Sequence, residues 1–467
     1  MTAASAELLF RGGFPTAEMA ASVRDARDCS RALEAYRFFY PTVSMEAVMQ
    51  GHRDAGVEDC RAALLMVCGP RHLLFTGSSD TPYLGTVLDL AAFGPIVVEL
   101  PSGPLVGVLN DHNSRWVADV GLHGADGGHG GRYLIVPPDY TGLVPSRHHV
   151  IRPATNVVLL AIRALTGDAD FGEALLALRR VAVYPLRDLD ASPTTTFVDV
   201  SDERVDLTPL RWERSLLFWS QLHKVLTEET VVDEFRPMYG LLAALGIEKG
   251  REFAPDARMT AILRQAAADG LDQMLVASFA STRADRMVWR DRCWEWPALR
   301  SAAGDFELPT GVDMEARDRW FAHAVGASRA MFLRAPTADS LSVMCLRDRS
   351  GSYLDGGRPY KLTMPQPVPA RAFWSITVYD AQTRSQIRTD EDRAVLRSTS
   401  ELRAMAPNRP LELYFGPKVP ASRQSRWLRT VSGRGYFVYL RLHGPDTHAF
   451  DDSWRPGDFE ELVDQSA

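Results

Sequence analysis

The chain lacks an excess of basic residues: 52 Lys and Arg stand against 59 Asp and Glu, a formal net charge of -7 over 467 residues. Nucleic-acid binding needs a basic face that displaces counterions, so we expect no nucleic-acid partner. No run of 18 apolar residues occurs, which excludes a membrane-spanning helix and predicts no membrane partner. Residues Met1 to Arg11 lack a basic segment followed by a long apolar stretch, so we expect a cytoplasmic protein.

Cysteine is also scarce, and its spacing points to no known site. The five cysteines form no Cys-x-x-Cys pair, so zinc knuckles and thioredoxin-type motifs are absent. We expect free, buried thiols in a reducing compartment. His123, Asp126 and His129 resemble loose metal ligands, but the stretch from Asp119 to Gly131 holds six glycines and predicts an irregular loop. We therefore expect no bound metal.

The common catalytic motifs are missing as well. The sequence has no GxSxG, HExxH, GxxxxGK[ST] or Rossmann-type GxGxxG motif, and no HxH pair in its C-terminal part. These absences disfavour α/β-hydrolases, zinc proteases, P-loop enzymes and dinucleotide-binding enzymes, so we expect no cofactor. Hydrolysis by a different arrangement of catalytic residues is still possible, because such arrangements are recognised by geometry and not by the order of the residues in the chain.

What is present indicates a globular protein of about three domains. Apolar residues make up 46% and charged residues 24%, typical of soluble proteins. A helical period runs from Thr16, a plausible N-cap, to Phe39. We expect Pro41 to end this helix and a second helix to cover Ser44 to His52, so that residues 1–57 form an N-terminal helical segment.

After residue 57, the hydrophobic pattern predicts a β unit, then a helical part, then a second β unit. Short apolar runs separated by Gly and Pro turns predict a β-sandwich over residues 58–205, flanked by helices from Asn156 to Ala164 and from Phe171 to Arg179. Residues 206–335 read as a helical domain, with a long helix after Asp256 and another from Asp313 to Met331. Residues 336–467 read as a jelly roll or similar sandwich. The expected fold is mixed, mainly β, with a helical domain.

Two turns carry candidate catalytic groups. The segment from Gly77 to Tyr83 combines hydroxyls, a carboxylate and a phenol, and Asp80 and Tyr83 are candidates for an acid–base pair, with Ser78 as a substrate contact. Asp355, in a Gly-rich turn, is a further catalytic candidate. In both places the alternative, a plain turn in which Asp and Ser bond their own backbone, stays open.

Candidate substrate contacts occur elsewhere. In the predicted strand from Phe373 to Asp380, the face with Trp374 is largely core and the face with Tyr379 is polar. Tyr379 is a catalytic candidate, and the candidate substrate contacts are Arg115, Trp294, Trp296, Trp374 and Arg384. For each, the alternative is a structural role: an internal ion pair for Arg115, packing between domains for the tryptophans, and a hydrogen-bonded sandwich corner for the strand.

Several long motifs together resemble one bacterial family. The motifs are AYRFFYPTVSME from Ala35, SDTPYLGTVLDL from Ser79, GPIVVELPSGPLVGVLND from Gly94, DVGLHGADGGHGGRYLIVPPDYTG from Asp119, GIEKGREFAPDARM from Gly246, GSYLDGG from Gly351, FWSITVYD from Phe373, YFGPK from Tyr414 and DDSWRPGD from Asp451. They resemble the two-part family of domains of unknown function DUF1254 and DUF1214, over almost the whole chain. The resemblance implies an immunoglobulin-like sandwich, a helical domain and a C-terminal jelly roll, and it implies no general activity.

The chain departs from the family pattern in places that bear on a site. Ser78 stands where the family usually has Asn, which offers more hydrogen-bonding groups than a single hydroxyl. The stretch from Trp289 to Trp296 looks divergent and is a candidate for setting this member's specificity. His123 and His129 stand where the family has residues that are not ligands, which further disfavours a metal.

Two hypotheses of different class follow. The first is a cofactor-independent enzyme that uses acid–base chemistry on a small or medium, partly apolar molecule, with hydrolysis slightly favoured over elimination, isomerisation or cyclisation. The second is a non-catalytic ligand-binding or assembly protein built on two β-sandwich domains. In either case the expected partner is a small molecule, and general frequencies among soluble enzymes predict a homodimer.

Overall fold

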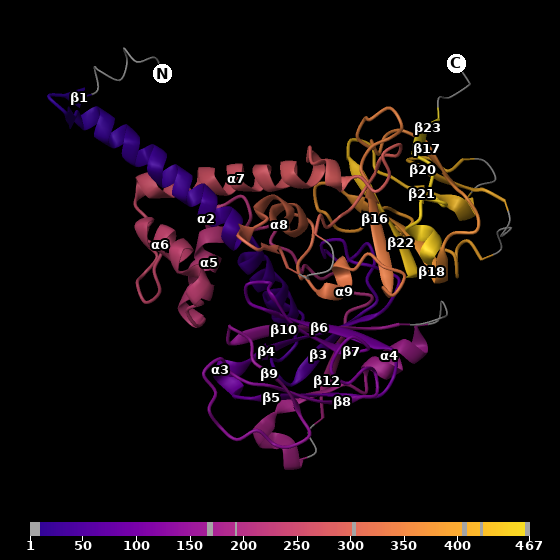
Figure 1. Cartoon of the computed structure of the whole chain (residues 1–467), viewed down its shortest axis with the longest axis horizontal. Coiled ribbons are helices and arrows are strands. Elements are labelled where there is room, and N and C mark those ends of the chain that lie inside the picture. Colours follow the sequence, from indigo (N-terminus) through magenta and orange to yellow (C-terminus); the bar gives the residue numbers. More distant parts are fainter. Residues whose placement is uncertain are drawn as a thin grey trace.

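The computed structural model describes residues 10–165, 171–191, 194–300, 305–403, 409–420 and 424–462. The chain has a mixed fold of several open sheets and a group of helices (Figure 1). Helix and strand occur in nearly equal amounts, so the expected predominance of β is not found. Within the described ranges, no helix is both long enough and apolar enough to cross a membrane.

One long helix replaces the two that the sequence predicted at the N-terminus. Helix α2, Ala17–Asp54, begins at the expected cap, because the Thr16 hydroxyl accepts from the Met19 N–H, but it continues through Pro41. Proline removes the hydrogen bond to the carbonyl four residues earlier, that of Arg37. Arg317 donates to the Arg37 carbonyl at 3.3 Å and to the Phe38 carbonyl at 2.6 Å, and so satisfies the backbone that Pro41 disturbs.

The N-terminal β unit consists of two sheets around one apolar core, below the helices in Figure 1. The six-stranded sheet has the order β12-β3-β4-β10-β6-β7. Its strands are β12 Thr196–Asp199, β3 Ala62–Met66, β4 Tyr83–Asp89, β10 Val157–Ala164, β6 Leu105–Asp111 and β7 Trp116–Gly121. The facing sheet, β11-β5-β8-β9, contains β11 Ala182–Pro185, β5 Ile96–Leu100, β8 Gly131–Ile135 and β9 His149–Ile151, and the short helices α3 Leu90–Phe93 and α4 Gly172–Leu178 flank the unit.

Two strands at the centre of this unit differ from the prediction. Residues Asn156 to Ala164, expected as a helix, form strand β10, and β4 was not foreseen. Strand β10 lies between β4 and β6, and the sheet is covered on both faces. A strand buried on both faces has no alternation of polar and apolar residues, so its sequence cannot be told from that of a buried helix.

The helices of the central part pack around the middle of α2, from Ala32 to Ala47. They are α5 Leu216–Glu228, α6 Arg236–Ala244, α7 Ala257–Phe279, α8 Met314–Phe321 and α9 Arg329–Phe332. The Asp256 side chain caps α7 as expected, by accepting from the Met259 N–H. The single helix expected from Asp313 to Met331 is instead two helices, because Ser328 caps a new one, α9.

The C-terminal β unit also has two sheets that share an apolar core. The five-stranded sheet, β13-β16-β22-β18-β19, contains β13 Trp294–Glu295, β16 Ser340–Cys345, β22 Tyr436–Pro445, β18 Ala370–Asp380 and β19 Val395–Arg397. The second sheet, β21-β20-β17-β23, contains β21 Trp427–Arg429, β20 Leu411–Gly416, β17 Tyr360–Met364 and β23 Glu460–Glu461. Two small hairpins lie elsewhere: β1 Phe10–Arg11 with β2 Phe14–Pro15, and β14 Glu307–Leu308 with β15 Gly311–Val312.

Candidate functional site

An apolar cavity of about 260 Å³ lies where the three parts of the chain meet. Its floor is one face of the six-stranded sheet, formed by alternate residues of neighbouring strands: Leu64, Met66, Tyr83, Gly85, Val108, Asn110, Leu159, Ala161 and Arg163. The helical part contributes Trp320 and Phe332 to the walls, and the C-terminal unit contributes Trp296, Tyr439 and Arg441. The cavity therefore forms only when all three parts are assembled.

His52, near the end of α2, is the titratable group of this cavity best suited to accept a proton. Its Nδ1 lies 2.8 Å from the Val48 carbonyl oxygen and must donate to it, which leaves the lone pair of the neutral ring on Nε2. Burial lowers the pKa of His52, so the ring stays neutral. Nε2 faces Gly85, where a Cβ atom would lie only 2.3 Å away, so the glycine makes room for the imidazole.

Polar groups gather at one side of the same floor. Tyr83 and Arg163 are direct cross-strand partners on β4 and β10, and both line the cavity. The Tyr83 oxygen accepts from the Ser78 N–H at 3.2 Å, and burial raises the pKa of Tyr83, so its phenol keeps its proton. Arg441 reaches the cavity from β22 and donates to the Thr76 carbonyl at 2.9 Å. A phenol and two guanidinium groups thus face one region of the cavity.

The segment from Thr76 to Asp80 is held against the polar face of the C-terminal sheet. Tyr379 donates to the Gly77 carbonyl at 2.8 Å, and Ser375 donates to Asp80 Oδ2 at 2.6 Å. The apolar side chains of the opposite face of β18, including Trp374, belong to the core. The predicted division of this strand into a core face and a polar face is confirmed. The polar face connects the C-terminal sheet to the N-terminal unit.

Asp80 lies behind the cavity wall and is enclosed by donors. His443 Nε2 lies 3.1 Å from Oδ2 and Arg397 Nε lies 3.6 Å from Oδ1. Burial alone would raise the pKa of Asp80, but His443, Arg441 and Ser375 hold it well below its usual range. A carboxylate that stays ionised balances neighbouring positive charge and does not exchange protons near neutral pH. Ser375 and His443 both face the carboxylate, which differs from a catalytic triad, where the histidine lies between the other two groups.

The structure places several other candidates away from the cavity. Asp355 lies in an exposed turn, where it accepts from the Gly357 N–H and pairs with Arg358. Arg115 lies over the Phe235 ring and 3.8 Å from Glu234. Trp294 is buried in the C-terminal core and donates to the Gly457 carbonyl. None of these three residues lines the cavity, and Trp374 does not line it either.

Arg384 is fully buried in an ion pair between the parts of the chain. It donates to both carboxylate oxygens of Glu213, at 2.8 and 2.7 Å, and its guanidinium lies over the Phe75 ring. Tyr40 of α2 donates to the same carboxylate at 2.8 Å. Both terminal nitrogens of the Arg384 guanidinium donate to protein groups, so this contact is structural. Trp296, by contrast, lines the cavity, with the Arg334 guanidinium 4.2 Å above its ring.

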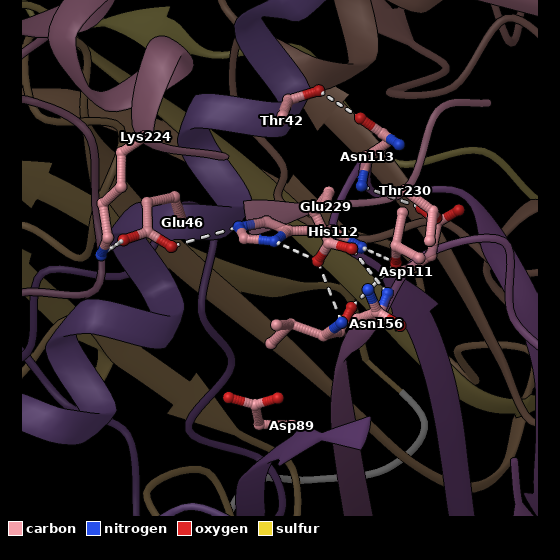
Figure 2. A network of polar contacts seen from close by, with 12 residues as sticks. Thr42, Glu46, Asp89, Asp111, His112, Asn113, Asn156, Lys224, Glu229 and Thr230 are labelled. Carbon is pink, nitrogen blue, oxygen red and sulfur yellow. Dashed lines mark hydrogen bonds and ion pairs between the residues drawn. The ribbon is translucent and has the colours of Figure 1, made fainter. Parts of the chain in front are cut away.

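A second buried network joins α2, the end of β6 and the end of α5 (Figure 2). His112 lies between two carboxylates, 3.1 Å from Glu46 and 2.8 Å from Glu229, and Lys224 donates to Glu46 at 2.6 Å. Burial alone would lower the pKa of His112, but the two carboxylates raise it to about 9. Burial would raise the pKa of Glu46, yet His112 and Lys224 lower it to about 2. The network is a set of internally paired charges.

The glycine-rich stretch is an ordered turn. Asp126 accepts from the Gly121 N–H at 2.8 Å and from the Tyr133 hydroxyl, and His123 pairs with Asp339, the residue before β16. Among the described residues, no group of three or more His, Cys, Asp or Glu side chains is arranged to hold a metal ion. All five cysteines are free thiols.

Comparison with protein families gives two matches, in the order that the motifs indicated. Residues 69–185 match the model "Protein of unknown function (DUF1254)", and residues 339–447 match "Protein of unknown function (DUF1214)". The chain therefore contains a DUF1254 domain and a DUF1214 domain, the two that the motifs resemble. The cavity lies between the two matched domains and the helices of the central part. No curated protein matches the chain.

Two solved structures are similar to this DUF1254/DUF1214 chain. One is the VPA0106 protein from Vibrio parahaemolyticus, with a TM-score of 0.53, 16% sequence identity, and 93% of this chain and 100% of that chain covered. The other is a putative uncharacterized protein from Burkholderia cenocepacia, with a TM-score of 0.41, 11% identity, and 94% and 96% of the two chains covered. The first likeness shows that the fold extends over nearly the whole chain.

Sequence reasoning missed most of the cavity's polar groups. His52 ends an apolar helix, Arg163 lies in a strand taken for a helix, and Arg441 is one arginine in a long strand. The one local signal was Gly85 within an apolar run, because glycine inside a strand often marks the close approach of another group. Ser78, Tyr83 and Trp296 are the predicted site residues that line the cavity.

Proposed function

We propose that this chain is a cofactor-independent enzyme that performs acid–base chemistry on a small, partly apolar molecule bound in the cavity. One observation carries the proposal: a neutral histidine with an unused ring nitrogen shares an apolar cavity with a phenol and guanidinium groups. Apolar cavities with a few polar groups and shifted pKa values are typical of active sites. Hydrolysis is the first reaction to test, ahead of elimination, isomerisation or cyclisation.

The proposed roles follow from the properties of each group. His52 accepts a proton at Nε2, either from a water that attacks the substrate or from the substrate itself. Tyr83 donates a hydrogen bond, and Arg163 and Arg441 stabilise negative charge that develops on the substrate. Asp80 serves as a positioning residue that balances Arg441, in place of the proton transfer expected from the sequence. Tyr379 likewise positions the segment that begins at Thr76.

The experiment is comparative mass spectrometry of a small-molecule extract of the native host. Wild type, His52→Gln and the exposed control His129→Gln are each incubated with the extract. We expect a metabolite that wild type and the control consume and His52→Gln does not, with all three proteins equally folded by circular dichroism. A gain of one water identifies hydrolysis, and an unchanged mass identifies isomerisation. Equal consumption by His52→Gln would contradict the assigned role.

The alternative function is binding without chemistry, and one observation favours it. The Asp80 and Tyr379 side chains form hydrogen bonds within the protein, and the cavity walls are mostly apolar, as a binding site requires. This alternative predicts that native mass spectrometry detects an unaltered ligand on the wild-type protein, while no metabolite is consumed.

We propose in addition the finer architecture that the resemblance implies. The shared core of each pair of sheets supports an immunoglobulin-like sandwich in the N-terminal unit and a jelly roll in the C-terminal unit. The domain limits 58–205, 206–335 and 336–467, a cytoplasmic location with a role in small-molecule metabolism, and a homodimer remain part of this proposal. Light scattering that gives the mass of a single chain would contradict the dimer.

A further inference from the structure

We infer that the ligand of the cavity is a small organic anion, a single carboxylate on an apolar body, and that Arg163 binds its charge. This inference names the substrate class of the cavity in the proposed function and rests on that function for its biological meaning. It concerns binding alone, so it can be tested without knowing the reaction.

The wall of the cavity carries positive charge. Three arginines line the cavity, Arg163, Arg334 and Arg441, and no aspartate or glutamate is among the described residues that line it. His52, which also lines the cavity, is neutral because burial lowers its pKa. A positive charge in apolar surroundings is costly unless an anion pairs with it. An anionic ligand supplies the missing charge, whereas a cationic ligand would be repelled.

The three arginines differ in how many of their donors are already used by protein groups. Arg441 donates to Thr377 Oγ1 at 3.3 Å and to the Thr76 carbonyl at 2.9 Å, with Asp80 as its nearby countercharge. Arg334 donates to the Ala298 carbonyl and lies over Trp296. Arg163 has no ion pair and no side-chain hydrogen bond with any described residue. It is therefore the arginine whose donors are available to a ligand.

The donors and the apolar walls of the cavity together define the form of the ligand. One unpaired guanidinium presents two parallel N–H groups, which match a planar carboxylate, and its single charge balances one negative charge. Tyr83, the cross-strand partner of Arg163, offers a hydroxyl beside it. The remaining walls are aromatic and aliphatic, including Phe75, Trp320 and Phe332. A cavity of about 260 Å³ has the liquid volume of about nine water molecules, room for about ten non-hydrogen atoms.

The test uses three probes that share one apolar body and differ in charge: 3-phenylpropanoate, 3-phenylpropan-1-ol and 3-phenylpropylammonium. Binding to the full chain is measured by isothermal titration calorimetry at neutral pH. A charge-assisted hydrogen-bonded pair predicts that the carboxylate binds at least about 10-fold more tightly than the alcohol, and that the ammonium binds least. Equal binding of alcohol and carboxylate, strongest binding of the ammonium, or no binding of the carboxylate in the millimolar range would each overturn the inference.

Two substitutions assign the effect to Arg163. Arg163→Met keeps much of the side-chain length and removes the charge, and Arg264→Met does the same at an exposed position of α7 outside the cavity. We expect Arg163→Met to bind the acid and the alcohol equally while it still binds the alcohol as wild type does, which also shows that the cavity is intact. Arg264→Met should keep the preference for the acid. If Arg163→Met fails to fold, Arg163→Gln takes its place.

The outcomes separate this inference from the proposed function. A preference for the acid that persists in Arg163→Met would overturn the role of Arg163 and leave the enzymatic proposal intact. Charge-selective binding together with no metabolite consumed by wild type would leave the ligand class standing and overturn the enzymatic proposal.

Discussion

His112 is a positively charged residue in the interior of the protein, and its charge depends on pH. The ring is about 1% exposed and lies between Glu46 and Glu229, which raise its pKa to about 9 (Figure 2). In the unfolded chain the pKa of histidine is about 6.5. The folded state therefore binds this proton more tightly than the unfolded state does. The resulting stabilisation is complete below pH 6.5 and is lost as pH rises through 9.

We predict that wild type loses up to about 3 kcal/mol of unfolding free energy from this group between pH 6.5 and 9.5, at 1.36 kcal/mol for each unit of pKa shift. His112→Gln should be less stable than wild type at pH 6.5 and should lack this loss. The exposed control His129→Gln should follow wild type. Urea unfolding at several pH values measures all three, and parallel curves for wild type and His112→Gln would contradict the assigned charge.

At the scale of elements, helix α2 shows how a tertiary contact overrides a local signal. Pro41 leaves the Arg37 carbonyl without its helical donor, and Arg317 of α8 supplies donors to that carbonyl and to the carbonyl of Phe38. The guanidinium is buried enough that its pKa falls to about 10. The continuity of α2 therefore depends on a residue about 280 positions away in sequence.

We predict that Arg317→Met destabilises the protein by about 2–3 kcal/mol, because two carbonyls lose a charged donor. In the background of Pro41→Ala the backbone N–H at position 41 restores the helical bond to Arg37, so the same substitution should cost less. A double-mutant cycle of urea unfolding free energies measures the coupling. Additive costs within about 0.5 kcal/mol would show that Arg317 and Pro41 act independently.

The crossing of α2 and α7 depends on a glycine. Gly270 lies against Tyr36, and a Cβ atom there would be 2.3 Å from a ring carbon. Gly240, on an exposed part of α6, has no atom within 4 Å of its Cβ position. At both positions alanine has a higher helix propensity than glycine, so the two positions differ only in the space available for a Cβ atom.

We predict opposite signs for alanine at these two positions. Gly270→Ala should destabilise by about 1–3 kcal/mol, because the added methyl forces the two helices apart. Gly240→Ala should stabilise by up to about 1 kcal/mol, the helix propensity of alanine over glycine. Thermal melts followed by circular dichroism compare both with wild type. A stabilised Gly270→Ala would contradict the close approach.

At the scale of the whole molecule, buried polar contacts join the three parts and so close the cavity. Arg384, after β18, pairs with Glu213, before α5, and Tyr40 of α2 contributes a third group. The segment from Thr76 to Asp80 connects the N-terminal unit to the C-terminal sheet in the same way. Because each contact crosses between parts, we expect the parts to unfold together.

We predict that Arg384→Met lowers stability by about 3–5 kcal/mol, because Glu213 is left as a buried charge without its partner. Arg384→Met combined with Glu213→Gln should recover at least about 1 kcal/mol of this loss, since glutamine can still accept from Tyr40 and carries no charge. Differential scanning calorimetry gives both the stability and the number of transitions. A double variant less stable than Arg384→Met would contradict the buried ion pair.

The sequence by itself determined the elements whose signals are local. The caps at Thr16 and Asp256, the short strands between Gly and Pro turns, the two faces of β18 and the family were all predictable, because each depends on neighbouring residues or on contiguous motifs. Tertiary structure decided the rest. Strand β10 became a strand because both of its faces are covered, and α2 stayed intact because Arg317 reaches it.

Most of the candidate site was decided by tertiary structure and not by local sequence. Ser78, Tyr83 and Trp296 were found from sequence, because they lie in polar or aromatic clusters that stand out locally. His52, Arg163 and Arg441 come from a helix and two strands of different sheets, and only the assembly of all three parts brings them to one cavity. Pairing across sheets and burial of charge depend on contacts between distant segments, which no local pattern encodes.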